Sequence, residues 1–289
     1  MPRTGPSVPP DFLVVGHLVQ DMIPTGRAYR QTGWRLGGSA AYASLLAARL
    51  GLRTAVLTAA GPDLDLEQLL PNIATYTVPG TITTRMLNRY RGGVRRSQHL
   101  LQRGSQIRSQ DVPEELRSAR IVLLGPVAGE VDAEVAGCFR GSLIGVEMQG
   151  WLREASFDRR IRPVHWHQAP LPPGAEALFV SDEDLLGGEQ EVALHRWSAR
   201  VPVVVCTRGE KGAEVAWRDE WRHVQAFPSR MVDATGAGDV FAAAFLIRYA
   251  EGADPWEAAR FAAAAASLVV EGEGVSNVPT RAMVEERMR

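Results

Sequence analysis

Short runs of apolar residues recur along the chain and alternate with segments in which small and apolar residues have helical spacing. The apolar runs are 12–16, 54–59, 121–125, 143–147, 177–181 and 201–207, and the helical segments are 39–50, 189–198, 238–249 and 254–270. A strand that is apolar along its whole length is buried on both faces, as in parallel sheets that helices cover on both sides. The pattern predicts an α/β fold, and because no linker interrupts it, we expect one domain over residues 1–289.

Charge and hydropathy limit the class of protein. The chain carries 33 acidic and 32 basic residues, and its net charge of -1 argues against binding to nucleic acid or to a membrane surface. Apolar runs such as 261–270 are much shorter than the roughly 20 residues that span a membrane. Residues 1–10 lack the apolar segment of a secretion signal, and two cysteines do not form a disulfide framework. We therefore expect a soluble cytoplasmic protein.

A loop rich in small residues opens directly into the apolar helix predicted at 238–249. The backbone N–H groups of Gly236, Ala237 and Gly238 would converge at the positive end of the helix dipole, which suits a phosphoryl group that gains charge during transfer. Asp239 follows at once. Its carboxylate has two interpretations, either a cap of the helix or a base that takes a proton from a substrate hydroxyl.

Residues 81–101 alternate in polarity, and Gly92-Gly93 interrupts the alternation. This pattern is typical of a two-stranded ribbon with a glycine turn. Inside an α/β chain such a ribbon indicates a flap over a site, although a solvated hairpin rich in arginine has the same pattern.

The sequence Asp-Ala-Thr-Gly-Ala-Gly-Asp at 233–239 resembles the C-terminal signature of the ribokinase-like carbohydrate kinases, the phosphofructokinase-B family. The resemblance implies a three-layer sandwich with a mostly parallel central sheet and a small β-lid formed from 18–36 and 81–101. It implies ATP as phosphoryl donor, Mg²⁺ as cofactor, and a sugar, polyol (inositol-like) or nucleoside hydroxyl as acceptor. By position, Asp239 is then the catalytic base, and the amides of 236–238 form the anion hole.

The resemblance extends to the N-terminal part of the chain, where it implies an acceptor site. Gly37-Gly38 before an alanine-rich helix is similar to the family's motif that grips the sugar, and Asp21 matches its substrate-binding aspartate. A carboxylate suits a polyol because it accepts hydrogen bonds from two adjacent hydroxyls. Tyr42 replaces the family's usual asparagine and shifts the expected acceptor towards an inositol- or nucleoside-like ring. Arg85, in the ribbon, is a candidate to contact a polar acceptor.

The donor site implied by the resemblance lies in the second half of the chain. Thr207 and Gly209 would border the phosphates, with Gly212 in the following turn. Ser181 and Asp184 stand at the two ends of the family's Asn-x-x-Glu motif, and Asp184 is the candidate ligand of Mg²⁺.

Asp233 and Thr235 match positions that form a K⁺ site in some relatives. The family includes both monomers and lid-mediated dimers, so a homodimer is compatible with the resemblance.

Three hypotheses follow. The first is a kinase that transfers the γ-phosphoryl group of ATP to an alcohol. The second is a regulator on the same fold that binds nucleotide or sugar without catalysis, which the changes at positions 42, 181 and 184 would support. The third is a kinase with another donor, such as ADP or a different triphosphate.

Overall fold

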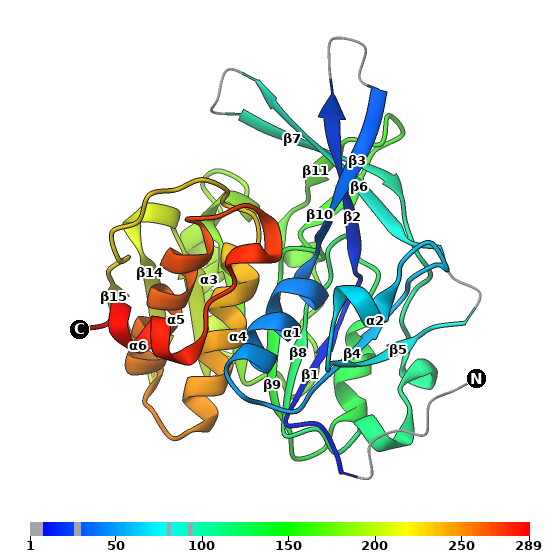
Figure 1. Cartoon of the computed structure of the whole chain (residues 1–289). Helices are drawn as coiled ribbons and strands as arrows, with labels where there is room; N and C mark the ends of the chain where they lie inside the picture. Colours follow the sequence, from blue (N-terminus) through cyan, green and yellow to red (C-terminus); the bar gives the residue numbers. More distant parts are fainter. Residues whose placement is uncertain (1–7, 26–29, 80–81, 92–94) are drawn as a thin grey trace.

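The computed structural model describes residues 8–25, 30–79, 82–91 and 95–289 (Figure 1). Within these residues the centre is a nine-stranded sheet with the order β15-β14-β13-β12-β9-β8-β1-β4-β5. Its strands are β1 (Phe12–Val15), β4 (Thr54–Thr58), β5 (Ala74–Thr77), β8 (Ile121–Leu124), β9 (Leu143–Glu147), β12 (Ala177–Ser181), β13 (Val203–Thr207), β14 (Ala213–Trp217) and β15 (Glu220–Val224). Neighbours from β5 to β13 are parallel, and β14 and β15 add an antiparallel edge. The predicted mostly parallel sheet is confirmed.

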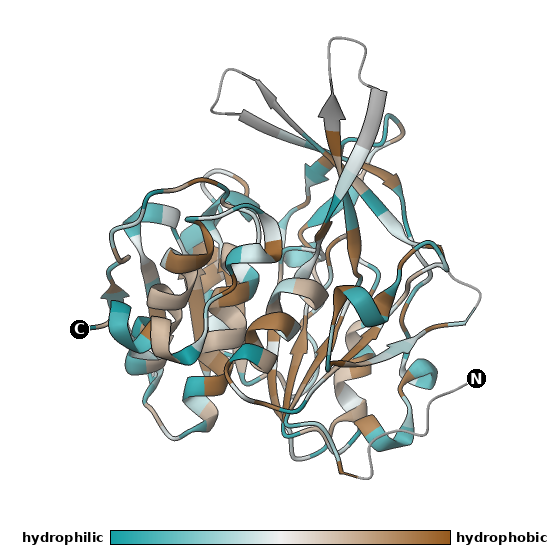
Figure 2. Ribbon diagram, viewed as in Figure 1, coloured by the Kyte–Doolittle hydropathy of each residue, from teal (hydrophilic) through white to brown (hydrophobic). Residues whose placement is uncertain are grey.

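Helices cover both faces of this sheet because its strands are apolar on both sides. The helices are α1 (Ser39–Arg49), α2 (Leu66–Leu69), α3 (Gln190–Ser198), α4 (Ala237–Ala250), α5 (Pro255–Val269) and α6 (Arg281–Arg287). Phe12 and Val14 of β1 share one core with α1, α4 and α5. Leu13 and Val15 face a second core that contains α3 and the 3-10 segment Ala133–Cys138. Figure 2 shows the apolar strands enclosed between these layers.

A second sheet projects from the strand ends at the place where the lid was expected, and it is called the lid sheet, or lid, below (Figure 1). Its order is β3-β2-β6-β7, and its strands are β2 (Val19–Thr25), β3 (Arg30–Gly37), β6 (Thr84–Arg91) and β7 (Arg95–Gln102). The lid was expected from 18–36 and 81–101; of these, 26–29, 81 and 92–94 lie outside the described residues, as do residues 1–7. The small hairpin β10 (Arg153–Ala155) and β11 (Ile161–Pro163) lies beside β7.

Short 3-10 helices complete the described chain. They are η1 (Ser109–Asp111), η2 (Glu114–Leu116), η3 (Ala133–Cys138), η4 (Trp166–Gln168), η5 (Asp182–Asp184), η6 (Gly209–Lys211) and η7 (Gly274–Asn277). Among the described residues, none of the helices has both the length and the apolar character that crossing a membrane requires.

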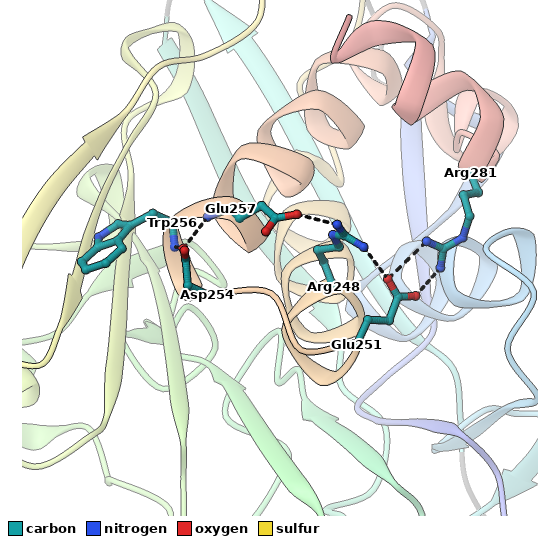
Figure 3. A network of polar contacts seen from close by, with 6 residues as sticks. All are labelled: Arg248, Glu251, Asp254, Trp256, Glu257 and Arg281. Atoms are coloured by element: carbon teal, nitrogen blue, oxygen red, sulfur yellow. Dashed lines mark hydrogen bonds and ion pairs between the residues drawn. The ribbon is translucent and has the colours of Figure 1, made fainter.

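Charged side chains join the ends of three helices on one side of the core (Figure 3). Arg248, near the end of α4, pairs with Glu257 of α5 and with Glu251, and the distance from Arg248 Nη1 to Glu251 Oε2 is 3.2 Å. Arg281 of α6 reaches the same Glu251 at 2.5 Å. A single exposed ion pair contributes little, but this network has shared partners and connects α4, whose other end bears the candidate catalytic loop, to α5 and α6.

Asp254 caps the N-terminus of α5, where its side chain accepts hydrogen bonds from the backbone N–H groups of Trp256 and Glu257 (Figure 3). We expect Asp254→Ala to lower the free energy of unfolding by about 1 kcal/mol, because these two donors lose their partner. Denaturant unfolding monitored by circular dichroism measures the change. Asp254→Asn is the matched control, since asparagine caps equally well; an equal loss in both variants would contradict the capping role.

Candidate active site

A cavity of about 680 Å³ lies where the lid meets the carboxyl ends of β12 and β13. Ligands of open α/β sheets bind at this edge because the loops that follow parallel strands converge there. Residues of the predicted site that line the cavity are Asp21, Gly38, Ser181, Asp184, Thr207, Gly209, Gly212, Thr235, Gly236, Ala237, Gly238 and Asp239. The fold therefore brings the two halves of the predicted site together around one space.

The candidate anion hole is the start of α4. Gly236 precedes the helix with a φ of +81°, a conformation that suits glycine, and Ala237 and Gly238 form the first turn. A Cβ atom at residue 236 would overlap the ring of Tyr42, which packs beneath this loop. Glycine at 236 is therefore required both by the backbone conformation and by the close approach of α1.

Asp239 faces the cavity from the first turn of α4. Its Oδ1 accepts a hydrogen bond of 2.5 Å from the hydroxyl of Ser39, the first residue of α1. Asp239 is not simply a helix cap, because the N-cap position belongs to Gly236, which offers no side chain. The carboxylate is thus held by a side chain from a distant part of the sequence.

Glu147 is a second carboxyl group beside this one, and sequence reasoning missed it. It ends β9 and is buried, and burial followed by the negative charge of Asp239 holds its pKa well above the usual range. A Cβ atom at Gly125 would overlap both Ser39 and Glu147, so this glycine leaves the space in which they sit. The neutral form of Glu147 is favoured here, which avoids a second negative charge next to Asp239.

The acceptor side of the cavity is built around Asp21 of β2. A Cβ atom at Gly37 would overlap the Asp21 carboxylate, so the lack of a side chain at residue 37 leaves room for that carboxylate. Gly37 itself does not line the cavity. Gly38 lines the cavity with a φ of +86°. Asn88 of β6 donates a 3.3 Å hydrogen bond to Asp21 Oδ1, which ties the carboxylate to the lid.

Two residues expected at the acceptor lie elsewhere. Tyr42 is 1% exposed, belongs to the core under the anion loop and does not line the cavity. Arg85 turns to Asp63 at 2.9 Å and to Gln20, outside the cavity lining. Both expectations are corrected. Tyr42 packs under the loop that contains Gly236. Arg85 joins lid strand β6 to the segment after β4 through its ion pair with Asp63. Their positions depend on packing that the local sequence does not encode.

The donor side is formed by the segments after β12 and β13. Thr207, Gly209 and Gly212 line it, and a Cβ atom at Gly212 would overlap the carbonyl of Val224. Beyond them the wall becomes apolar, with small and aromatic side chains from α5 and from the segment before α4: Phe227, Ala263, Ala266 and Val270.

Asp184 is engaged by Arg153 of β10, another residue that sequence reasoning missed. The distance from Arg153 Nη2 to Asp184 Oδ1 is 2.5 Å, and the Asp184 side chain is 2% exposed. Among the described residues, no group of three or more carboxylate, histidine or cysteine side chains could hold a metal ion. One cavity-lining carboxylate still fits Mg²⁺, which is bound largely by substrate phosphates and water and needs few protein ligands.

The expected K⁺ position has a cationic side chain beside it. Asp233 accepts hydrogen bonds from the backbone N–H groups of Thr235 and Gly274, and Arg35 Nη1 lies 3.9 Å from its carboxylate. Burial acts to raise the pKa of Asp233, but these N–H groups and Arg35 hold it below the usual range. Arg35 also pairs with Glu273 at 2.7 Å. This donor set does not fit a monovalent cation, because a guanidinium already lies beside the carboxylate that would bind the ion.

Comparisons with known proteins find similarity to kinases. The pfkB family of carbohydrate kinases matches residues 148–281. A cytidine kinase of Thermococcus kodakarensis is 29% identical over 259 residues, which cover 84% of this chain and 89% of the relative. A nucleoside kinase of Methanothermobacter thermautotrophicus is 27% identical over 303 residues, 93% of this chain and 92% of the relative.

A solved structure extends the likeness over the whole fold. A pyrophosphate-dependent kinase of the ribokinase family superimposes with a TM-score of 0.77 at 18% identity, covering 96% of this chain and 99% of the other. The family match over residues 148–281 and the two relatives support a ribokinase-like kinase that phosphorylates an alcohol group. The solved structure shows that the fold is that of the ribokinase family.

Replacing the buried acid Glu147 tests its protonation state. With a raised pKa in the folded state, Glu147 keeps a proton that it loses on unfolding, so its contribution to stability falls as pH rises above the ordinary glutamate range. We expect Glu147→Gln to gain stability relative to the parent as pH rises, by about 1.4 kcal/mol for each unit of raised pKa. Chemical unfolding across pH measures this difference. The control is Glu154→Gln, which replaces an exposed glutamate. A stability difference between Glu147→Gln and the parent that does not change with pH would contradict the raised pKa of Glu147.

The Arg35 pair generates a second prediction. We expect turnover to be unchanged when K⁺ is replaced by tetramethylammonium at constant ionic strength, because Arg35 supplies the positive charge near Asp233. The variant Arg35→Ala should become dependent on K⁺, since its two carboxylates lose their cation. Steady-state rates in both salts test this, and a parent enzyme that needs K⁺ would refute it.

Proposed function

We propose that this chain transfers the γ-phosphoryl group of ATP to a hydroxyl group of a nucleoside, sugar or inositol-like polyol, with Asp239 as the general base. The observation that carries the proposal is the arrangement of one cavity wall, where the Asp239 carboxylate adjoins the amides at the start of α4. A base for the attacking hydroxyl and an anion hole for the transferred group are the two elements that phosphoryl transfer needs.

The acceptor hydroxyl would lie between Asp21 and Asp239. Asp21, fixed by Asn88, would bind neighbouring hydroxyls and orient the attacking one. Asp239 would take the hydroxyl proton, while the hydrogen bond from Ser39 keeps its carboxylate turned to the cavity. As the acceptor oxygen bonds to phosphorus and the bond to ADP breaks, the N–H groups of 236–238 would stabilise the charge on the phosphoryl oxygens.

Mg²⁺, when bound with ATP, neutralises the phosphates, and Asp184 is the cavity residue that would hold it. The lid sheet would close over the acceptor and exclude water, which otherwise competes for the phosphoryl group. The full-length relatives are named cytidine and nucleoside kinases, which supports a nucleoside among the candidate acceptors.

The apolar end of the cavity favours a nucleotide as donor. Phe227, Ala263 and Val270 would pack against a base, whereas an inorganic donor would leave these side chains without a partner. The pyrophosphate dependence of one structural neighbour makes pyrophosphate the competing donor to include in assays.

The alternative is a binding regulator without catalysis. The placement of Tyr42 in the core removes one reason for it, because that substitution does not alter the cavity wall. Asp239, held against the anion hole, favours the kinase, since binding of an anion alone gains nothing from an adjacent carboxylate. Phosphoryl transfer from ATP to a panel of nucleosides, sugars and inositols separates the two.

We expect Asp239→Asn to lower kcat by about 10²–10⁴-fold, because the amide cannot accept the hydroxyl proton. Nucleotide affinity should stay close to that of the parent, as measured by calorimetry with a non-hydrolysable ATP analogue. Asp254→Asn, at the N-cap of the neighbouring helix α5 and outside the cavity, is the matched control. Turnover near the parental rate in Asp239→Asn would remove Asp239 from the role of base.

A further inference from the structure

The cavity wall has a strongly one-sided set of charges. Its carboxylate side chains are Asp21, Glu183, Asp184, Glu210 and Asp239. Among the described residues that line it, Arg153 is the one arginine or lysine. A donor with several phosphate charges would meet this single cationic side chain, so Arg153 is the lining side chain whose charge attracts phosphate.

Arg153 is held on two sides. Its Nε and Nη2 lie 3.2 and 2.5 Å from Asp184 Oδ1, and its Nη1 donates a 2.9 Å hydrogen bond to Gln98 Oε1. A guanidinium has five N–H groups, and these contacts use three of them, so two remain for a ligand in the cavity. The Arg153 side chain is 17% exposed, against 2% for Asp184, so the guanidinium is the more accessible of the two groups.

Gln98 connects this arginine to the lid and to the acceptor side. Gln98 Nε2 donates a 3.0 Å hydrogen bond to Asn88 Oδ1, and Asn88 Nδ2 donates in turn to Asp21. Hydrogen bonds therefore run without a break from Asp184 through Arg153 and two lid strands to Asp21. The position of the guanidinium depends on the same lid strands that fix the acceptor carboxylate.

We propose that Arg153 binds the phosphoryl group in transfer, and that Gln98 positions it when the lid strands are in place. This inference rests on the proposed kinase function and adds a contact to it. The guanidinium forms no covalent bond; its two remaining N–H groups donate to phosphoryl oxygens, opposite the amides of 236–238. A planar cation suits this task because its donors match two oxygens of one phosphate.

A double-mutant cycle separates this role from simple neutralisation of Asp184. The variants are Arg153→Gln, Asp184→Asn and the combination, with Arg153→Lys as the conservative exchange. We expect Arg153→Gln to lower kcat by about 10³-fold, at the lower end of the range for arginines that stabilise transferred phosphoryl groups, and to do so equally in the Asp184→Asn background. The acceptor KM should change little, and Arg153→Lys should keep part of the activity. No effect of Arg153→Gln in the Asp184→Asn background would overturn the proposal.

A binding measurement keeps the test independent of turnover. Inorganic tripolyphosphate without Mg²⁺ should raise the melting temperature of the parent, of Asp239→Asn and of Asp184→Asn, but not of the double variant Arg153→Gln/Asp184→Asn. The matched control is Arg53→Gln, which breaks a similar arginine–aspartate pair, with Asp11, outside the cavity lining. Equal stabilisation of all variants would refute the phosphate contact. Tripolyphosphate binding through Arg153 in a protein that transfers no phosphoryl group would instead overturn the kinase proposal alone.

Discussion

The contact between the N-terminal ends of α1 and α4 is the constraint on which the site depends. The Tyr42 ring fills the space under Gly236, and the Ser39 hydroxyl donates a hydrogen bond to Asp239. Helix α1 therefore positions both the loop of the candidate anion hole and the Asp239 carboxylate. Both helices pack on the same face of the sheet, in one core. The N-terminal and C-terminal parts of the chain therefore meet at Asp239 and the candidate anion hole. The sheet holds the N-terminal ends of α1 and α4 next to each other.

The contact between α1 and α4 places the carboxyl groups of Asp239 and Glu147 close together, and burial favours the protonated form of Glu147. Glu147 lies under Ser39 with Asp239 nearby, where two carboxylates would repel each other in a medium of low polarity. Because Asp239 reaches the cavity and Glu147 is buried, the proton is favoured on Glu147. A neutral acid at this position adds no second negative charge beside Asp239.

The sequence predicted what is encoded locally. The apolar runs predicted β1, β4, β8, β9, β12 and β13, and the loop at 233–239 carries the candidate anion hole and Asp239 in consecutive residues, so their proximity needed no tertiary information. Tyr42 and Arg85 were predicted at the acceptor but lie outside the cavity lining. Their positions in a motif do not reveal which side chains they pack against in the folded chain. Glu147 and Arg153 were missed for a related reason: each acquires its partner only when β9, β10 and η5 are brought together.

The surplus of carboxylates in the cavity has a consequence for the order of events. An empty site lined by acidic side chains repels a polyphosphate unless positive charge offsets them, and among the described lining residues Arg153 is the arginine or lysine that supplies it. Arg153 is held by hydrogen bonds to both Asp184 and Gln98, and Gln98 belongs to the lid. A lid strand that shifts would move the guanidinium away from the phosphates. If Arg153 binds the phosphoryl group as proposed, its position depends on the lid strand that carries Gln98.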